Sequence, residues 1–281
     1  MKDKNNTLRF GAGNAKLSLG IGTFSLPAGH SCPFAKECYS KADRLTGRIT
    51  DGQHCQFRCF AATQEARHPS IRVSRWKNFE ALKNLSVEAM TAKIQRSLPK
   101  GYAYIRVHVS GDFFNEKYFV AWLNVALNNP LVTFYGYTKA TPFLVKYKAY
   151  IPRNFRFTAS KGGTCDSLIQ KHKLRSAEVF FSVKEAEDKG MSIDHDDSLA
   201  MTSEKSFGLL LHGTQPAKSK ASAAWEQIKK TVGGYTEDST NKRKKMAGEK
   251  QAVVFLNIKD GKVIFPKQMK SSFTVHSHVV A

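Results

Sequence analysis

Residues 104–127 read YIRVHVSGDFFNEKYFVAWLNVAL, which places a strand-like run, a glycine turn and a helix-like run in direct succession. The run 104–109 is rich in β-branched and aromatic residues, which favour strands. Asn115 is placed to open a helix from Glu116 to Leu127. Four apolar residues of that helix fall on one face: Phe119, Trp122, Leu123 and Ala126.

The same alternation continues along the chain. Helix-like segments separate five strand-like runs, at 104–109, 132–138, 155–160, 179–183 and 207–211. One of these helices opens at Thr141-Pro142, with proline at the first helical position. Repeated strand–helix–strand units predict an α/β fold whose parallel strands are joined by right-handed crossovers. The pattern fits an open sheet as well as a full or partial (βα) barrel.

Upstream of this repeat the chain is less regular. Residues 1–22 are punctuated by Gly and Asn and are expected to be irregular, and residues 30–60 form a Cys-rich loop. Other segments carry strand or helix signals: a short strand at Thr23–Pro27, and helices at Ala61–Arg67, Ser70–Asn84 and Ser86–Leu98. Ser70 and Ser86 are the expected N-caps of the last two helices.

Downstream, residues 214–251 are rich in Lys, Ser, Thr and Gly and break the repeat. We expect a helix at 221–232 and a closing β-hairpin, Val253–Ile258 and Val263–Phe265, around the turn Asp260-Gly261. The chain therefore divides into a barrel-like catalytic domain, residues 1–215, and a basic C-terminal extension, residues 216–281.

The charge balance indicates a polyanionic partner. Of 281 residues, 44 are Lys or Arg and 23 are Asp or Glu, which gives a net charge of +21. Such a field attracts nucleic acid, and we expect DNA before RNA. Only Lys242–Lys245 forms a dense basic run, so a broad basic surface is favoured over a basic tail. With 41% hydrophobic residues, a chain disordered throughout is excluded.

Membrane and export signals are missing from the sequence pattern. No apolar run reaches the roughly 18 residues of a spanning helix, and no signal peptide opens the chain. We therefore expect a protein that does not enter membranes and works in the cytoplasm.

Small or polar residues follow each of the five strand-like runs, and the carboxyl ends of parallel strands are where α/β folds place active sites. Those residues are Ser110-Gly111-Asp112, Thr138-Lys139, Ser160, Ser182 and His212-Gly213. Asp112 is the strongest candidate acid, although it could instead cap the following helix. The cluster Asp194-His195-Asp196-Asp197 could bind a metal, supply an acid/base pair or be a solvated loop.

Four of the five cysteines fall within one short segment, as Cys32, Cys38, Cys55 and Cys59, with the spacing C-x5-C-x16-C-x3-C. Disulfides are rare in the cytosol, so this clustering favours a metal or an iron–sulfur cluster. His30 and His54 could complete a mixed site. Nearby Lys36, Lys41 and Arg58 are expected to lower the thiol pKa values. Buried structural cysteines are the alternative, and the isolated Cys165 is expected to be one.

Several of these segments resemble the gene product 88 family of bacteriophage proteins. The likeness covers about residues 10 to 215 and is carried by Thr23–Pro33, Cys38, Arg58–Ala62, Arg75-Trp76-x-Asn78-Phe79 and Ser110–Phe114. It implies a phage origin more than a reaction.

A more distant likeness is to phage proteins related to radical S-adenosylmethionine enzymes. It rests on Cys38-Tyr39, Gly111-Asp112-Phe113 and Thr133–Lys139 in this order. The resemblance implies a full or partial (βα) barrel whose first loop binds a [4Fe-4S] cluster through three cysteines. Carried over, the ligands are Cys32, Cys38 and Cys59, with Cys55 as a substitute or fourth ligand. Ser110-Gly111-Asp112, with Thr138, would hold the cofactor. The usual C-x3-C-x2-C spacing is absent, which leaves zinc open.

Three functions follow from these observations. The first is a nucleic-acid-modifying enzyme that uses the cluster and S-adenosylmethionine, with Asp112, Lys139, Ser160 and His212 positioning cofactor and substrate. The second is a base-exchange transglycosylase with a structural zinc site, Asp112 as nucleophile and Asp196 or Asp197 as its acid/base partner. The third is a non-catalytic nucleic-acid-binding or host-interaction protein whose metal only fastens the amino-terminal loop.

Overall fold

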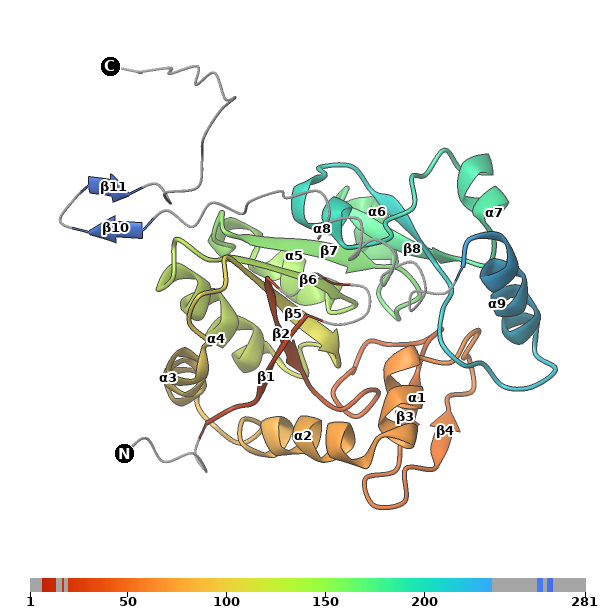
Figure 1. Ribbon diagram of the computed structural model, residues 1–281, viewed down its shortest axis with the longest axis horizontal. Coiled ribbons are helices and arrows are strands. Elements are labelled where there is room, and N and C mark those ends of the chain that lie inside the picture. Colours follow the sequence, from red (N-terminus) through yellow and green to blue (C-terminus); the bar gives the residue numbers. More distant parts are fainter. Residues whose placement is uncertain (1–6, 14–16, 18–19, 234–256, 260–261, 265–281) are drawn as a thin grey trace. The chain divides into compact units, whose positions relative to one another are not determined.

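A computed structural model of the chain describes residues 7–13, 17, 20–233, 257–259 and 262–264 (Figure 1). The chain divides into two compact units, residues 1–239 and 240–281. In the second unit the described residues form two short antiparallel strands, β10 (Asn257–Lys259) and β11 (Lys262–Ile264). The remainder of the expected hairpin and the run Lys242–Lys245 lie outside the described residues.

A seven-stranded sheet forms the centre of the first unit, and the order of its strands is β1-β2-β5-β6-β7-β8-β9. The strands are β1 (Phe10–Ala12), β2 (Ile21–Ser25), β5 (Tyr104–Ser110), β6 (Thr133–Thr138), β7 (Phe155–Ser160), β8 (Ser176–Phe180) and β9 (Phe207–Leu210). β1 pairs with β2 antiparallel, and all other neighbours are parallel. The predicted α/β class and parallel sheet are confirmed.

The sheet is open among the residues that the structure describes. β1 and β9 are its two edges and do not pair with each other, so the full barrel that the sequence allowed is wrong. Two boundaries also differ from the sequence prediction. β8 ends at Phe180, because residues 183–188 turn into helix α7, and residues 10–12 form the edge strand β1 where irregular chain was expected.

Within the described residues, ten helical segments connect and cover the strands. They are α1 (Phe60–Arg67), α2 (Pro69–Glu80), α3 (Val87–Ser97), α4 (Glu116–Leu127), α5 (Thr141–Lys146), the 3-10 helix η1 (Lys148–Tyr150), α6 (Ser167–Lys171), α7 (Val183–Asp188), α8 (Ser198–Thr202) and α9 (Lys220–Thr231). The caps at Ser86 and Asn115 are confirmed, since their side chains accept hydrogen bonds from Ala89 N and Tyr118 N. Ser70 is not a cap, because α2 already begins at Pro69.

The expected Cys-rich loop contains regular structure. β3 (Ser40–Ala42) and β4 (Ile49–Asp51) pair antiparallel and form a separate two-stranded sheet within it. Thr46-Gly47 lies in the turn of this hairpin. Gly47 has φ +74°, a conformation that glycine adopts without strain.

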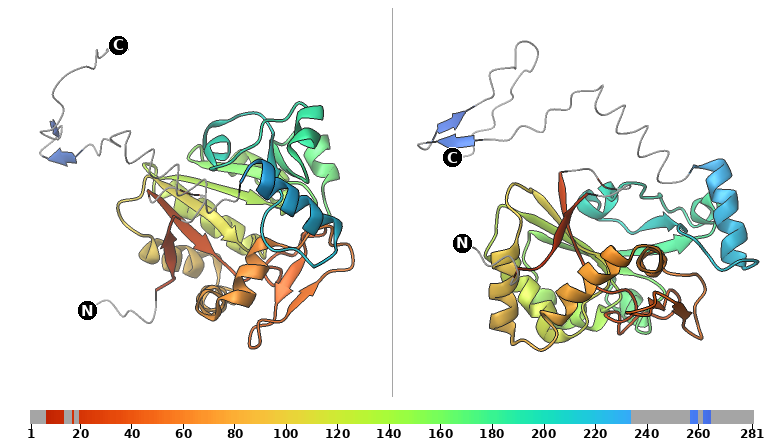
Figure 2. Two further views of the ribbon diagram at one scale, coloured as in Figure 1. Left: turned by 45° about the vertical axis from the view of Figure 1, so that its right-hand side comes forward. Right: turned by 60° about the horizontal axis from the view of Figure 1, so that its bottom comes forward.

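Apolar side chains cover both faces of the large sheet. On one face α3 and α4 lie side by side (Figures 1 and 2), and Met90, Ile94 and Trp122 pack against Phe24 and Val107 of the strands. On the other face a smaller cluster joins residues from the sheet and α8: Leu17, Ile21, Tyr135, Ala177, Ala200 and Phe207. The sheet is therefore a rigid base for the loops that leave its strand ends.

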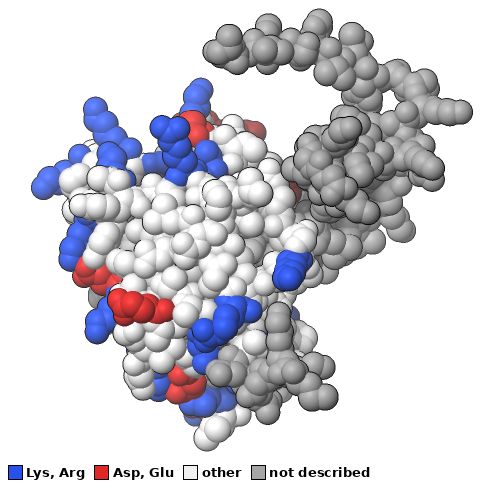
Figure 3. Space-filling model, turned by 90° about the vertical axis from the view of Figure 1, so that its left-hand side faces the viewer, with Lys and Arg blue, Asp and Glu red and all other residues white. Residues whose placement is uncertain are grey.

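The surface in Figure 3 carries Lys and Arg side chains around its margin, with few Asp or Glu side chains beside them. The middle of this face is uncharged. None of the helices in the described part of the chain is long and apolar enough to span a bilayer.

Candidate functional site

A cavity of about 580 Å³ lies at the carboxyl ends of the parallel strands. Ten of the predicted site residues line it: Cys32, Cys38, Cys59, Ser110, Gly111, Asp112, Thr138, Lys139, Ser160 and His212. They come from the segment after β2, the start of α1 and the ends of β5, β6, β7 and β9. Because these strands are parallel, their ends meet at one edge of the sheet, which brings together residues far apart in the sequence.

The turn Ser110-Gly111-Asp112 packs directly on the chain that leaves β2. Ser110 Oγ donates to Leu26 O at 2.8 Å, and Leu26 N donates to Ser110 O at 2.8 Å. Gly111 has φ +84°, and a Cβ built on it would lie 2.5 Å from Ser31 Oγ and 2.6 Å from Leu26 Cβ. Glycine is therefore required here both for its conformation and for the close approach of the two segments.

We expect Gly111→Ala to lower the free energy of unfolding by about 3 kcal/mol or more, because it combines a strained φ with a clash in a packed region. Gly101→Ala is the matched control, since Gly101 has φ +85° but nothing lies within 4 Å of its added Cβ. The control isolates the backbone strain, of about 1 kcal/mol. Urea unfolding of both variants measures the difference, and equal losses would contradict the close approach.

Asp112 is buried, with 5% of its surface exposed, and three donors hold its carboxylate. Oδ1 accepts from Phe113 N at 2.7 Å and from Thr138 Oγ1 at 2.6 Å, and Oδ2 accepts from Lys139 N at 2.8 Å. Burial raises the pKa of Asp112, although these hydrogen bonds and the nearby Lys139 ammonium oppose the rise. The carboxylate therefore ties the end of β5 to the end of β6 while it lines the cavity, and Asn115, not Asp112, caps α4.

Lys139 and Ser160 supply hydrogen-bond donors to the same wall. Lys139 Nζ donates to Ser160 Oγ at 2.7 Å and to Lys161 O at 2.8 Å. An ammonium carries three hydrogens, and a hydroxyl that accepts one hydrogen bond can still donate its own hydrogen. Lys139 is only 7% exposed, so its ammonium and the Ser160 hydroxyl form a positively charged part of the cavity wall that suits an anionic group.

Cys32, Cys38 and Cys59 lie close enough to influence each other electrostatically. Burial is the main reason why the pKa of Cys32 is raised, and Asp112, Cys59 and Cys38 add to the rise. Burial, and then Cys38, raises the pKa of Cys59 to about 12. The expectation that nearby Lys and Arg lower the thiol pKa values is therefore wrong for these two cysteines, because desolvation and mutual repulsion outweigh those cations.

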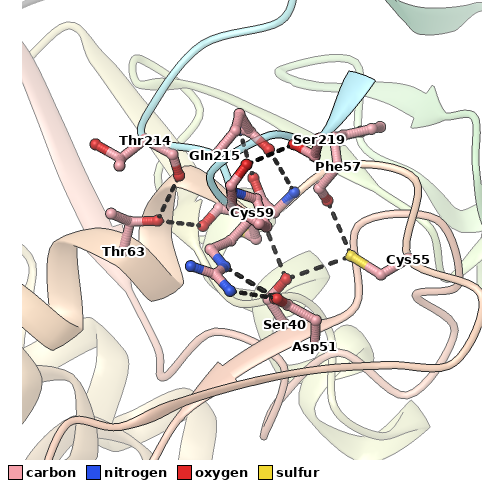
Figure 4. Close-up of polar contacts among 11 residues, drawn as sticks. Ser40, Asp51, Cys55, Phe57, Cys59, Thr63, Thr214, Gln215 and Ser219 are labelled. Carbon is pink, nitrogen blue, oxygen red and sulfur yellow. Dashed lines mark hydrogen bonds and ion pairs between the residues drawn. The ribbon is translucent and has the colours of Figure 1, made fainter. Parts of the chain in front are cut away.

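Cys55 differs from the other three cysteines in its contacts, although Cys38 is near enough to help burial raise the pKa of Cys55. Its Sγ donates to Phe57 O at 3.1 Å and lies 3.6 Å from Ser40 Oγ, and it does not line the cavity. Figure 4 shows it on the far side of Ser40 from Cys59. His30 and His54 are also outside the lining, and His30 Nε2 lies 2.9 Å from Ala42 O. No group of three His, Cys, Asp or Glu in the described residues has the geometry of a single-metal site.

The chain that follows β9 holds the segment that carries Cys59 through hydrogen bonds. Gln215 Oε1 accepts from Arg58 N at 2.7 Å, and Gln215 Nε2 donates to Arg58 O at 3.1 Å. Thr63 Oγ1 donates to Thr214 O at 3.3 Å, and Cys59 N donates to Ser40 Oγ at 3.2 Å (Figure 4). We call residues 212–219 the β9-exit segment. The sequence pattern gave no signal for this contact, since Gln215 is polar and follows no motif.

A buried ion pair at the wall of the cavity was also not predicted from the sequence. Arg75 Nη1 lies 2.9 Å from Glu65 Oε1, and both side chains are almost fully buried. Glu65 Oε1 also accepts from Ala28 N at 2.9 Å and from Ser110 Oγ at 3.3 Å. One carboxylate thus connects α1, α2, the chain after β2 and the end of β5.

The cluster at residues 194–197 is not a solvated loop, because Asp194 and Asp197 are 1% and 0% exposed. Arg106 Nη1 lies 2.7 Å from Asp197 Oδ2, and Tyr137 Oη donates to Asp197 at 3.2 Å. Asp194 accepts a hydrogen bond from Ala200 N. These carboxylates fasten the loop before α8 to the sheet. The transglycosylase hypothesis requires Asp196 or Asp197 to lie in the cavity with Asp112. Neither of them lines it.

Comparison with known proteins identifies a family and no closer relative. No significant match to a curated protein or to a solved structure is found. The family model described as gene product 88 matches residues 1–227, a range that contains the whole sheet and every residue described at the cavity. The chain therefore belongs to the gene product 88 family.

Proposed function

We propose that the protein is a nucleic-acid-modifying enzyme that holds a [4Fe-4S] cluster and S-adenosylmethionine in the cavity at the strand ends. One observation carries the proposal: Cys32, Cys38 and Cys59 line the same cavity as Ser110-Gly111-Asp112, whereas Cys55 does not. The distant likeness to radical S-adenosylmethionine proteins implies three cysteine ligands, with Cys55 as a substitute or fourth, and the lining favours Cys32, Cys38 and Cys59 over Cys55 for this set.

The proposal places the three cysteines around a cluster, in which each thiolate binds a different iron. The thiols are neighbours, since Cys38 and Cys59 raise the pKa of Cys32 and Cys38 raises that of Cys59. Burial and mutual repulsion disfavour the thiolates of Cys32 and Cys59, and a cationic centre among them would reverse this, because a coordinating thiol is deprotonated.

The chain's own groups would hold the cofactor in a defined orientation. When bound, the cluster and S-adenosylmethionine together supply radical chemistry. The turn Ser110-Gly111-Asp112 offers carbonyl and carboxylate oxygens to the cofactor's ammonium group, with Thr138 fixing the Asp112 carboxylate. Lys139 and Ser160 offer donors to its carboxylate. The buried position of these groups excludes bulk water from the reacting atoms.

The order of the strands in the sheet supports a partial (βα) barrel. From β2 onward, each parallel strand lies beside the next strand of the same sheet in chain order, as in one part of a (βα) barrel. The cavity would then occupy the place where barrels carry their active sites.

Charge supports nucleic acid as the substrate. Among the described residues of the lining, Arg58, Arg75 and Arg106 are ion-paired with Asp51, Glu65 and Asp197, which lie outside it. The other basic side chains of the lining, Arg9 and Lys139, stand against one acidic side chain, Asp112. Together with the net charge of +21, this lining favours an anionic ligand. The transglycosylase hypothesis gains no support, because Asp112 is held by three donors and no second carboxylate lines the cavity.

The test is anaerobic purification with absorption spectroscopy and iron, sulfide and zinc analysis. We expect near four irons and four sulfides per chain, in line with a cubane cluster, for the wild type and for Cys55→Ala. Cys32→Ala, Cys38→Ala and Cys59→Ala should lose most of the iron. Cleavage of S-adenosylmethionine is then measured for the wild type and for Asp112→Asn.

Cys55→Ala is the matched control for this series, since Cys55 lies in the same segment but outside the cavity. One zinc and no iron would overturn the proposal and favour the binding-protein alternative, with a steep salt dependence and no turnover. Loss of iron from Cys55→Ala to the same extent as from Cys59→Ala would show that the cavity does not define the ligand set.

A further inference from the structure

Two aromatic side chains form one wall of the cavity at the end opposite to β1. Phe60, the first residue of α1, and His212, just after β9, have ring centroids 4.6 Å apart and planes tilted by 36°. Both line the cavity, as do the apolar side chains of Val179, Leu209 and Leu211. We call Phe60 and His212 the ring pair.

The fold holds this pair in place by contacts with the backbone. Gly213 has φ +86°, and a Cβ built on it would lie 2.8 Å from Phe60 Cβ, so the turn after His212 lies directly on Phe60. The Gln215 side chain then hydrogen-bonds both the N–H and the carbonyl of Arg58. His212 Nδ1 lies 3.2 Å from Leu210 O. The ring pair is therefore preorganised, which lowers the cost of binding a flat ligand against it.

The other side chains of the lining indicate which chemical group the flat ligand carries. The basic side chains of the cavity include Arg9, which is exposed, and Lys139, whose ammonium contacts only neutral acceptors within hydrogen-bond distance. A wall of rings and aliphatic groups, in a cavity whose lining also carries Arg9 and Lys139, suits a planar base that carries an anionic phosphate. An aliphatic chain would not use the rings, and a bare anion would not use the apolar wall.

We propose that the ring pair binds one nucleobase of a single nucleic-acid strand by stacking, which makes Phe60 and His212 the residues that seat the target base. This inference takes one thing from the proposed function, namely that the macromolecule is a nucleic acid. The groups it would face are buried: Asp112, Ser110 and Lys139 are at most 7% exposed. A base inside a duplex cannot reach such groups, so the target is a single-stranded base or one displaced from the helix.

The experiment measures binding of short oligothymidylates to the full chain at one fixed salt concentration. One strand carries a single 2-aminopurine, a second carries an abasic site at that position, and a third is the first annealed to its complement. We expect the single strand to bind with quenched 2-aminopurine fluorescence. The abasic strand should bind about 5- to 150-fold more weakly, the range of one base–aromatic stack, and the duplex should bind without quenching.

Variants separate stacking from folding. His212→Ala should reduce affinity for the 2-aminopurine strand to that for the abasic strand, and His212→Phe, which keeps a ring, should restore it. Tyr150→Ala is the control, because Tyr150 is a 71% exposed ring outside the cavity lining and should bind like the wild type.

Two results would overturn the inference. The first is equal affinity for the abasic and 2-aminopurine strands. The second is restoration of fluorescence by excess S-adenosylhomocysteine, which would assign the ring pair to the adenine of the cofactor. Neither result depends on the iron and sulfide content, so failure of the stacking site and failure of the proposed cluster are distinguishable.

Discussion

Acid is expected to destabilise the protein through His108, which lies on β5 and is 3% exposed. Burial, and then the charge of Arg106, lowers the pKa of His108 to about 3, whereas in the unfolded chain it titrates near 6.5. Between these values the unfolded state binds a proton that the folded state does not, so stability falls as the pH falls from about 6.5 towards 3. On going from about pH 7 to pH 4 the loss is about 3 kcal/mol.

His108→Gln isolates this effect. Its amide can keep a hydrogen bond to Tyr118 Oη, which lies 2.8 Å from His108 Nε2, but it does not titrate. Urea unfolding at several pH values should show a flatter acid limb for the variant than for the wild type, and carboxyl groups shared by both proteins cancel in the comparison. Parallel limbs would mean that His108 is protonated in the folded state.

Removing Arg75 is expected to be equally severe. Arg75→Met should lower the free energy of unfolding by about 3–5 kcal/mol, because it leaves the Glu65 carboxylate buried without its cation. Arg75 also donates to Ala61 O at 3.0 Å and to Gln64 Oε1, so α1 and α2 lose a direct connection. Denaturant unfolding near pH 7 measures the loss.

The double variant Glu65→Gln/Arg75→Met is the control for this ion pair. It removes both charges, so it should recover part of the stability that Arg75→Met loses. Burial raises the pKa of Glu65 above its ordinary value despite Arg75, and without Arg75 the pKa rises further. The loss in Arg75→Met should therefore shrink as the pH falls and Glu65 becomes protonated. A loss below about 1 kcal/mol would show that the two groups are not coupled.

Most helices and strands were predictable because each carries a local sequence signal. Asn115 and Ser86 begin helices at the predicted positions, since an N-cap is a contact with a residue only three positions ahead. The edge strand β1 was missed because it contains Gly11 and pairs only with β2. Ser70 failed as a cap because Pro69 fixes the first helical residue.

The candidate site was predictable where topology alone brings residues together. In a parallel sheet, Asp112, Lys139 and His212 must share one edge, and they line one cavity. The same reasoning could not separate Cys55 from Cys59, since both lie in the same segment and only the contact of Cys55 with Phe57 O distinguishes them. It also missed Gln215 and the Glu65–Arg75 pair, because these contacts join segments whose spacing follows no period.

The Gln215 contact has a consequence for how the protein is made. It joins residues that are 157 positions apart, so Arg58 and the neighbouring Cys59 cannot be fixed until the ribosome has produced the chain beyond β9. Contacts over such separations form late, after the local units between them. Cys59 thus emerges early, but this contact to its neighbour Arg58 forms late. A nascent or truncated chain that ends before Gln215 lacks the contact, so the segment that carries Cys59 is less firmly held in it than in the longer chain.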